Sequence, residues 1–162
     1  MNFTEELRAA DKEELPQIRK LYRSVVGLEG CTWDAFYPNE DTLLEDFEAG
    51  QLFVLRKGGQ ILGAGSIVPE NELDELEHWQ FRKNAMELAR IVIAPAFQGN
   101  GYGKLLVKKL CDRLARSGCK AVHLLVAQEN KPAQQMYQRI GFQNRGTCHR
   151  YEIDFFVYEK EL

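Results

Sequence analysis

The feature that most constrains this chain is a glycine-rich turn between an apolar segment and an amphipathic one. The turn spans residues 98–103 and reads QGNGYG. It follows the apolar run of residues 85–94, and residues 103–116 after it carry leucines at helical spacing. A glycine-rich turn that leads into a helix presents backbone N–H groups and the positive end of the helix dipole, which together bind phosphate. The sequence therefore predicts a strand, a phosphate-binding turn and a helix, in that order.

Two familiar phosphate-binding motifs fail on this turn. A dinucleotide-binding fingerprint that starts at Gly99 needs glycine at position 104, where Lys104 stands. A P-loop needs serine or threonine at position 105, where Leu105 stands. A third pattern, Q/R-x-x-G-x-G/A, is met from position 98 to position 103. Taken alone, the turn is either this phosphate site or a glycine-rich loop that caps the helix.

The rest of the chain alternates strand and helix signals, with no linker, repeat or low-complexity tract between them. Gly58-Gly59 separates two apolar runs and predicts a hairpin turn. This order predicts an α/β (α+β) fold, a mixed and mostly antiparallel sheet of about six to seven strands with helices on both faces. Strands are expected at residues 5–10, 52–55, 61–68, 85–94, 121–126, 142–148 and 151–158, and helices at 11–26, 41–49, 103–116 and 132–140.

Charge and composition exclude several classes of protein. A net charge of −3 gives no sign of the basic face that a nucleic-acid binder needs. No apolar run approaches the roughly 20 residues that cross a bilayer. The first six residues are acidic and lack the basic segment followed by an apolar segment that is typical of a signal peptide. The four cysteines show neither C-x-x-C spacing nor a zinc-type pairing with histidine. We therefore expect a cytoplasmic protein with reduced thiols and no metal site, which binds neither nucleic acid nor a membrane.

Three segments together resemble the GNAT superfamily of N-acetyltransferases. The first is the turn, and the second is the strand pattern E-L-x-x-I-x-I/V at residues 87–93. The third is the pattern N-x-x-A-x-x-x-Y-x-x-x-G-F, met at Asn130, Ala133, Tyr137, Gly141 and Phe142. All three occur in the family's order, and the order of strands and helices fits from about residue 3 onward. The resemblance implies a single N-acetyltransferase domain over residues 1–162.

The resemblance also implies that acetyl-coenzyme A is the acyl donor and binds at the turn. Its pyrophosphate would lie on backbone N–H groups of the turn. Its pantetheine arm would pair with a strand edge, where strands 87–94 and 121–126 splay apart to admit it. Asn130 would contact the pantetheine or hold the start of its own helix. The cofactor-binding residues implied are Ile91, Ile93, Gln98, Gly99, Asn100, Gly101, Gly103, Lys104 and Asn130.

Two side chains are candidates for proton transfer. Tyr137 holds the family's tyrosine position and is the candidate acid, although it could instead be a packed aromatic. Glu87 is the candidate base, because a carboxylate among apolar strand residues is costly unless it faces a cleft or has a partner. Partial desolvation there would raise the pKa of Glu87, and a chain of waters could also serve as the base. Strand alternation places Arg90 on the opposite face from Glu87.

The resemblance places the acceptor pocket between residues 27–39 and residues 143–150. Trp33 and Tyr37 either wall this pocket or are ordinary packing. The acidic run at residues 70–77 is either a solvated face or a mouth that attracts a cationic amine.

Two further sets of basic residues have open roles. His149 and Arg150 would suit a substrate carboxylate instead of a cationic amine. The basic residues of the helix after the turn either serve the 3′-phosphate of coenzyme A or form its outer face: Lys104, Lys108 and Lys109.

These features lead to one functional hypothesis and two alternatives. The chain is expected to transfer an acetyl group from acetyl-coenzyme A to a primary amine of a small molecule or peptide, by direct attack on the thioester. The first alternative is acetylation of protein N-termini or lysines, which needs an open groove beside the last hairpin. The second is a non-catalytic sensor that binds coenzyme A. The family also makes a homodimer an expectation, by analogy alone.

Overall fold

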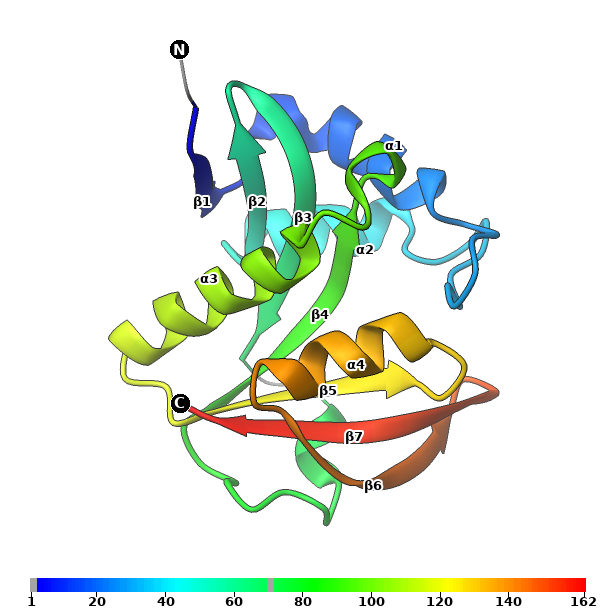
Figure 1. Ribbon diagram of the computed structural model, residues 1–162, viewed down its shortest axis with the longest axis vertical. Coiled ribbons are helices and arrows are strands. Elements are labelled where there is room, and N and C mark those ends of the chain that lie inside the picture. Colours follow the sequence, from blue (N-terminus) through cyan, green and yellow to red (C-terminus); the bar gives the residue numbers. More distant parts are fainter. Residues whose placement is uncertain (1–2, 70–71) are drawn as a thin grey trace.

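A seven-stranded sheet organises the chain in the computed structural model, which describes residues 3–69 and 72–162 (Figure 1). The strand order is β1-β2-β3-β4-β5-β7-β6, and every neighbouring pair is antiparallel except β4 and β5. The strands are β1 (Glu5–Ala9), β2 (Leu52–Lys57), β3 (Gln60–Val68), β4 (Ala85–Ile93), β5 (Ala121–Ala127), β6 (Gln143–Arg150) and β7 (Ile153–Glu161). The α-helices are α1 (Leu15–Ser24), α2 (Glu40–Glu48), α3 (Tyr102–Arg116) and α4 (Lys131–Arg139). The predicted mixed sheet, mostly antiparallel, is confirmed.

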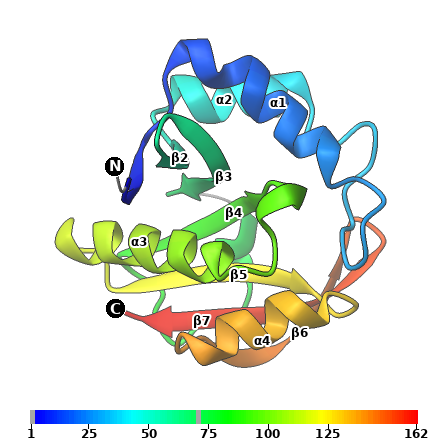
Figure 2. The same cartoon turned by 45° about the horizontal axis from the view of Figure 1, so that its top comes forward.

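The helices cover both faces of the sheet, as the sequence predicted. Helices α1 and α2 lie on one face, and α3 and α4 on the other (Figure 2). Strand β2 shows the reason, because its four apolar residues alternate between the two cores: Val54 packs with α1 and α2, whereas Phe53 and Leu55 pack with α3. A strand buried on both faces reads as a continuous apolar run instead of an alternating one.

The first helix begins later than its apolar pattern predicts. Asp11 precedes a short 3-10 turn, Lys12–Glu14, and its backbone N–H donates to the Glu14 carboxylate at 2.8 Å. Helix α1 then starts at Leu15 with proline in its first turn, where a missing N–H costs nothing. The predicted range 11–26 therefore contains two consecutive helical elements.

The connection between β3 and β4 packs against β5 and β7. It contains the 3-10 turn Glu72–Glu75, and it docks through Trp79, whose ring stacks on His123 of β5 with centroids 3.7 Å apart. Backbone N–H groups of Gln80 and Phe81 donate to the buried carboxylate of Glu159. The acidic run expected at residues 70–77 falls here, and its first two positions lie outside the described residues. Within the described ranges, no helix has the length and apolar character needed to span a bilayer.

Candidate functional site

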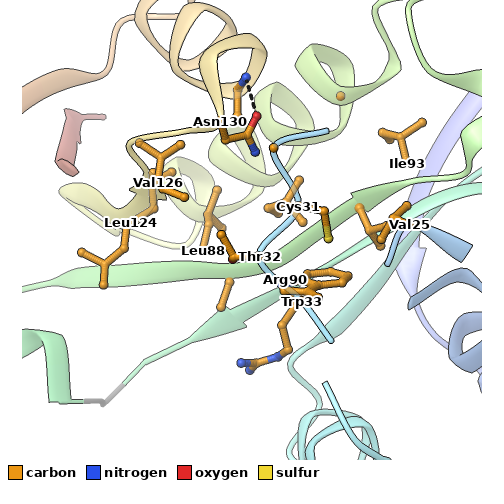
Figure 3. Close-up of a pocket in the computed structure, with 18 of the residues that line it drawn as sticks. Val25, Cys31, Thr32, Trp33, Leu88, Arg90, Ile93, Leu124, Val126 and Asn130 are labelled. Carbon is orange, nitrogen blue, oxygen red and sulfur yellow. Dashed lines mark hydrogen bonds between the residues drawn. The ribbon is translucent and has the colours of Figure 1, made fainter. Parts of the chain in front are cut away.

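The cleft of this protein opens where β4 and β5 part. The two strands pair in parallel only from Ala85–Glu87 to Ala121–His123, and then diverge toward their carboxyl ends. A cavity of about 1250 Å³ lies along this divergence. The predicted splay of the two strands is therefore present in the structure. Figure 3 shows the labelled side chains of β4, β5 and the loop after α1 around this cavity.

The glycine-rich turn forms one end of the cleft. Gly99 and Gly101 have φ angles of 80° and 82°, which L side chains rarely adopt, and a Cβ at either position would meet nothing within 4 Å. Gly101 is the N-cap of α3, and its carbonyl accepts the first helical hydrogen bond, from Leu105. The N–H groups of the first helical turn therefore have no partner within the helix. The turn is open to the cleft and has the form of an anion site.

Two polar side chains of the turn brace it from within. The amide of Gln98 donates to the carbonyl of Ile93 at 3.0 Å, and the amide of Asn100 donates to the carbonyls of Phe97 and Gln98. Of the nine residues implied for the cofactor, Asn100 alone is not among the cleft-lining residues. Its side chain stabilises the turn, so any contact with a ligand would come from its backbone.

Asn130 lies at the start of α4, where the loop after α1 meets it. Its side-chain oxygen accepts from the backbone N–H of Ala133 at 3.2 Å and caps the helix (Figure 3). The backbone of Gly30 approaches so closely that a Cβ there would lie 2.9 Å from the same oxygen. One of the two alternatives for Asn130, holding the start of its own helix, is therefore observed. The same residue also lines the cleft.

Tyr137 of α4 lies at the base of the cleft and is buried. Its ring makes edge-on contacts with Phe142 and Tyr158, at centroid distances of 5.3 and 6.3 Å. Burial raises the pKa of the Tyr137 hydroxyl well above its usual value. The phenol is therefore protonated at neutral pH, which is the state that a general acid requires.

Glu87 and Arg90 lie on the same face of the sheet, so the prediction that strand alternation separates them was wrong. Strand β4 has a bulge, in which Arg90 and Ile91 together oppose Gly65 of β3, and Arg90 has a φ of 52°. A bulge adds one residue and so resets the alternation of side chains. Glu87 lies half-buried along the cleft, on the face opposite Leu88, which packs against α3.

Arg90 is held by a polar network that the sequence analysis missed. Its guanidinium binds the buried carboxylate of Asp46 through two hydrogen bonds, at 2.7 and 2.8 Å, and donates to the hydroxyl of Tyr37 at 3.1 Å. Ser66 of β3 also donates to Asp46, at 2.7 Å. Burial alone would lower the pKa of Arg90, but these hydrogen bonds outweigh it and raise the pKa. The helical spacing of Asp46 from Leu43 indicates that Asp46 lies on the inward side of α2, but it does not identify Arg90 as its partner.

The opposite end of the cleft is built from the loop of residues 25–39 and the last hairpin. Trp33 and Tyr37 of the loop line it, and Trp33 packs edge-on against Tyr22 at 5.5 Å. The hairpin contributes Tyr151, which stands in the turn between β6 and β7.

His149 and Arg150 are not among the cleft-lining residues. The two residues that do the turning are Tyr151 and Glu152, both with positive φ, so His149 stays on β6 and its Nδ1 contacts the Asp154 carboxylate at 2.7 Å. The expectation of a substrate carboxylate at this pair is therefore not supported by the geometry.

Some of the remaining candidate residues line the cleft and others do not. Lys104 lines the cleft, whereas Lys108 and Lys109 do not, and among the described residues 72–77 only Leu73 does. The four cysteines are free thiols, and the described residues contain no group of three or more histidine, cysteine or acidic side chains that could hold a metal ion.

Comparisons with known proteins agree on one family. A model of the acetyltransferase (GNAT) family matches residues 15–142. N-alpha-acetyltransferase RimI of Mycobacterium tuberculosis is 33% identical over 96 residues, which are 59% of this chain and 54% of the relative. Spermine/spermidine N(1)-acetyltransferase of Bacillus subtilis is 39% identical over 69 residues, 42% of each chain. The chain thus spans about half the length of the curated relatives it matches.

The fold has close counterparts among solved structures. That of yncA from Salmonella typhimurium with its cofactor acetyl-CoA has a TM-score of 0.77 and 21% identity, and the match covers 100% of this chain and 95% of that one. At this identity the likeness concerns the fold.

Proposed function

Because the chain belongs to the acetyltransferase (GNAT) family, we propose that it transfers an acetyl group from acetyl-coenzyme A to a primary amine of a small molecule or peptide. The observation that carries the proposal is the cleft between β4 and β5. It brings the glycine-rich turn, Glu87 and Tyr137 along one cavity, although they come from separate elements. A structural counterpart whose cofactor is acetyl-CoA supports the choice of donor.

The coenzyme would bind at the turn and along β4. Open N–H groups at the start of α3 suit the pyrophosphate, and Lys104 in the first turn adds a positive charge. Ile91 and Ile93 anchor β4 in the core beside α3, so their backbone edge is held rigidly for the pantetheine arm. Asn130 stands at the start of α4, which borders the same cavity. The proposed cofactor-binding residues remain Ile91, Ile93, Gln98, Gly99, Asn100, Gly101, Gly103, Lys104 and Asn130, with Asn100 acting through the conformation of the turn.

The reaction would need one base and one acid. A lysine-like amine must lose a proton before it attacks, at a cost of roughly 4–5 kcal/mol at pH 7. Glu87 would take this proton directly or through water, and the amine nitrogen would then attack the thioester carbon. As the carbon–sulfur bond breaks, the coenzyme thiolate would receive a proton from the Tyr137 hydroxyl, and the proton that the nitrogen loses on forming the amide would restore the hydroxyl through solvent. The position of Tyr137 in the wall of the same cavity as Glu87 supports the second role.

Two alternative functions would use the same cleft. Acetylation of a protein N-terminus or lysine needs an open groove, and exposed residues at the loop and the last hairpin favour it. A non-catalytic sensor would bind the coenzyme without turnover.

The test is thiol release from acetyl-coenzyme A with a panel of amines, beside a thermal-shift titration with the coenzyme. An enzyme would release thiol steadily with at least one amine. Its melting temperature would rise with the concentration of coenzyme, because the coenzyme binds the folded state. A shift without release would indicate the sensor. No shift at millimolar coenzyme would contradict the whole proposal.

A further inference from the structure

Exposed apolar side chains gather at one end of the cleft. Five large hydrophobic residues are exposed among the described ones, and four of them lie on the loop of residues 25–39 or on the last hairpin turn. We call these four the aromatic rim: Leu28, Phe36, Tyr37 and Tyr151. Phe36 is 82% exposed and Tyr151 65%, whereas the fifth residue, Phe3, packs beside Gly58. Exposed apolar side chains that gather on one side of a protein are typical of a surface where another molecule binds.

The aromatic rim continues the cleft outward. Leu28, Tyr37 and Tyr151 line the cavity, whereas Phe36, which precedes Tyr37 in the loop, is exposed outside it. The loop of residues 25–39 and the turn between β6 and β7 lie on the same side of the molecule in both views (Figures 1 and 2). A ligand confined to the cavity would leave Phe36 in water. The rim therefore fits a ligand that extends beyond the cleft.

The charges at this end disfavour a carboxylate on the acceptor. Glu29, Asp34 and Glu45 line it, together with Glu87. The basic residue there is Arg90, and its guanidinium is occupied by Asp46. The other basic lining residues, Lys104 and Arg139, belong to α3 and α4.

A free amino acid would place its own carboxylate beside the reacting amine and meet this negative charge. A peptide has an uncharged amide at that position. Charge and shape thus favour a polypeptide.

On these grounds, and resting on the proposed acetyltransferase function, we propose that the aromatic rim docks a polypeptide acceptor. The N-terminal amine enters the cleft toward Glu87, and the second and third residues of the acceptor carry apolar side chains that cover Phe36 and Tyr151. Burial of one aromatic side chain against such a surface favours binding by about tenfold or more. The preference therefore resides in KM for the acceptor, while the affinity for acetyl-coenzyme A stays unchanged.

The first experiment compares two amidated hexapeptides that differ only at positions two and three, with phenylalanine in one and serine in the other. Initial rates of thiol release give kcat/KM for each peptide, for L-alanine and for spermidine. The expected kcat/KM of the phenylalanine peptide is about tenfold or more above that of the serine peptide, and L-alanine has the lowest value. Equal values for the two peptides would overturn the proposal, as would a higher value for spermidine.

Variants then locate the preference. Phe36→Ser and Tyr151→Ser should each lower the ratio of the two peptides severalfold, and the double variant should bring it close to one. Phe3→Ser is the matched control, because it removes an exposed phenylalanine far from the cleft and should keep the ratio. A ratio that survives both rim variants would show that the rim does not bind the acceptor. Melting temperatures of all variants verify that they fold.

Binding separates this inference from the proposed function. A fluorescein-labelled phenylalanine peptide, labelled at its C-terminus, is titrated with the protein in the presence of coenzyme A and followed by anisotropy. If no amine is acetylated, the proposed function fails, and binding of this peptide that Phe36→Ser weakens still supports the rim. If amines are acetylated but the two peptides bind and react alike, the rim proposal alone fails.

Discussion

The two ends of the cleft are built in different ways. The part of the cleft proposed for the phosphates of the coenzyme is formed by consecutive residues, because the turn of residues 98–103 runs directly into α3. The acceptor end is assembled from segments far apart in the chain, from Leu28 to Tyr151, and its central cation is held by a residue of α2. A contiguous site depends on local conformation, whereas an assembled site depends on register, packing and paired charges. The two ends should therefore respond differently to substitution.

The largest effect is expected at the turn. Gly101→Glu would place a side chain and a negative charge at the start of α3, where a Cβ meets only open space. Acetyl-coenzyme A binding should be abolished, with no thermal shift at millimolar coenzyme. Gly118→Glu is the control, since Gly118 follows the other end of α3 with a φ of 93° and equally open surroundings. Both variants should lose about 1–2 kcal/mol of stability through the strained backbone, but only Gly101→Glu should lose binding. Retained affinity in Gly101→Glu would refute the turn as the phosphate site.

This contrast also explains what the sequence could predict. The turn, its helix and the order of strands and helices along the chain follow from glycine placement and apolar periodicity, which are local signals, and the structure confirms them. The sheet face on which Arg90 lies was predicted wrongly, because a single bulge residue inverts the alternation of side chains along β4. The bulge is defined by the pairing of β4 with β3, which the sequence of β4 alone does not show. The partnership of Asp46 with Arg90 joins residues 44 positions apart, so no local pattern shows it.

The second effect concerns Tyr137, which stands between the two ends. Tyr137→Phe should lower kcat by about 10²-fold or somewhat more, with little change in coenzyme affinity, as loss of a general acid requires. Tyr158→Phe is the matched control, because Tyr158 is equally buried and its ring contacts Tyr137. Its hydroxyl accepts from Gln138, so this control should lose about 1 kcal/mol of stability and keep its kcat. An unchanged kcat in Tyr137→Phe, with chemistry rate-limiting, would make the tyrosine a packing residue.

The third effect tests Glu87 by pH. A base acts only when it is deprotonated, so kcat/KM of the wild type should fall as pH drops below the pKa of Glu87. Glu87→Gln should reduce kcat/KM by about 10²-fold and remove this low-pH limb. Glu45→Gln, at an exposed carboxylate that also lines the cleft, should keep the limb.

Three results separate the possible roles of Glu87. A shifted limb with a modest loss of rate would indicate proton transfer through water. A lower melting temperature with an intact profile would indicate a structural role. A profile that overlays the wild type would exclude Glu87 as the base.

The smallest effect on rate, and the sharpest test of independence between the two ends, is expected from Asp46→Asn. The change removes the charge that holds Arg90 and leaves a largely buried guanidinium without its counter-ion. Breaking a buried pair in this way costs about 3 kcal/mol of unfolding free energy. Glu40→Gln on the same helix is the matched control, because its pair with Arg19 is exposed and should be worth less than about 1 kcal/mol. Since Arg90 also donates to Tyr37 of the acceptor loop, Asp46→Asn should raise the acceptor KM severalfold. The dissociation constant of acetyl-coenzyme A, measured by calorimetry, should not change, because the turn is braced by its own amides. A weaker coenzyme affinity in Asp46→Asn would show that the bulge couples the two ends, and that the acceptor end cannot be altered alone.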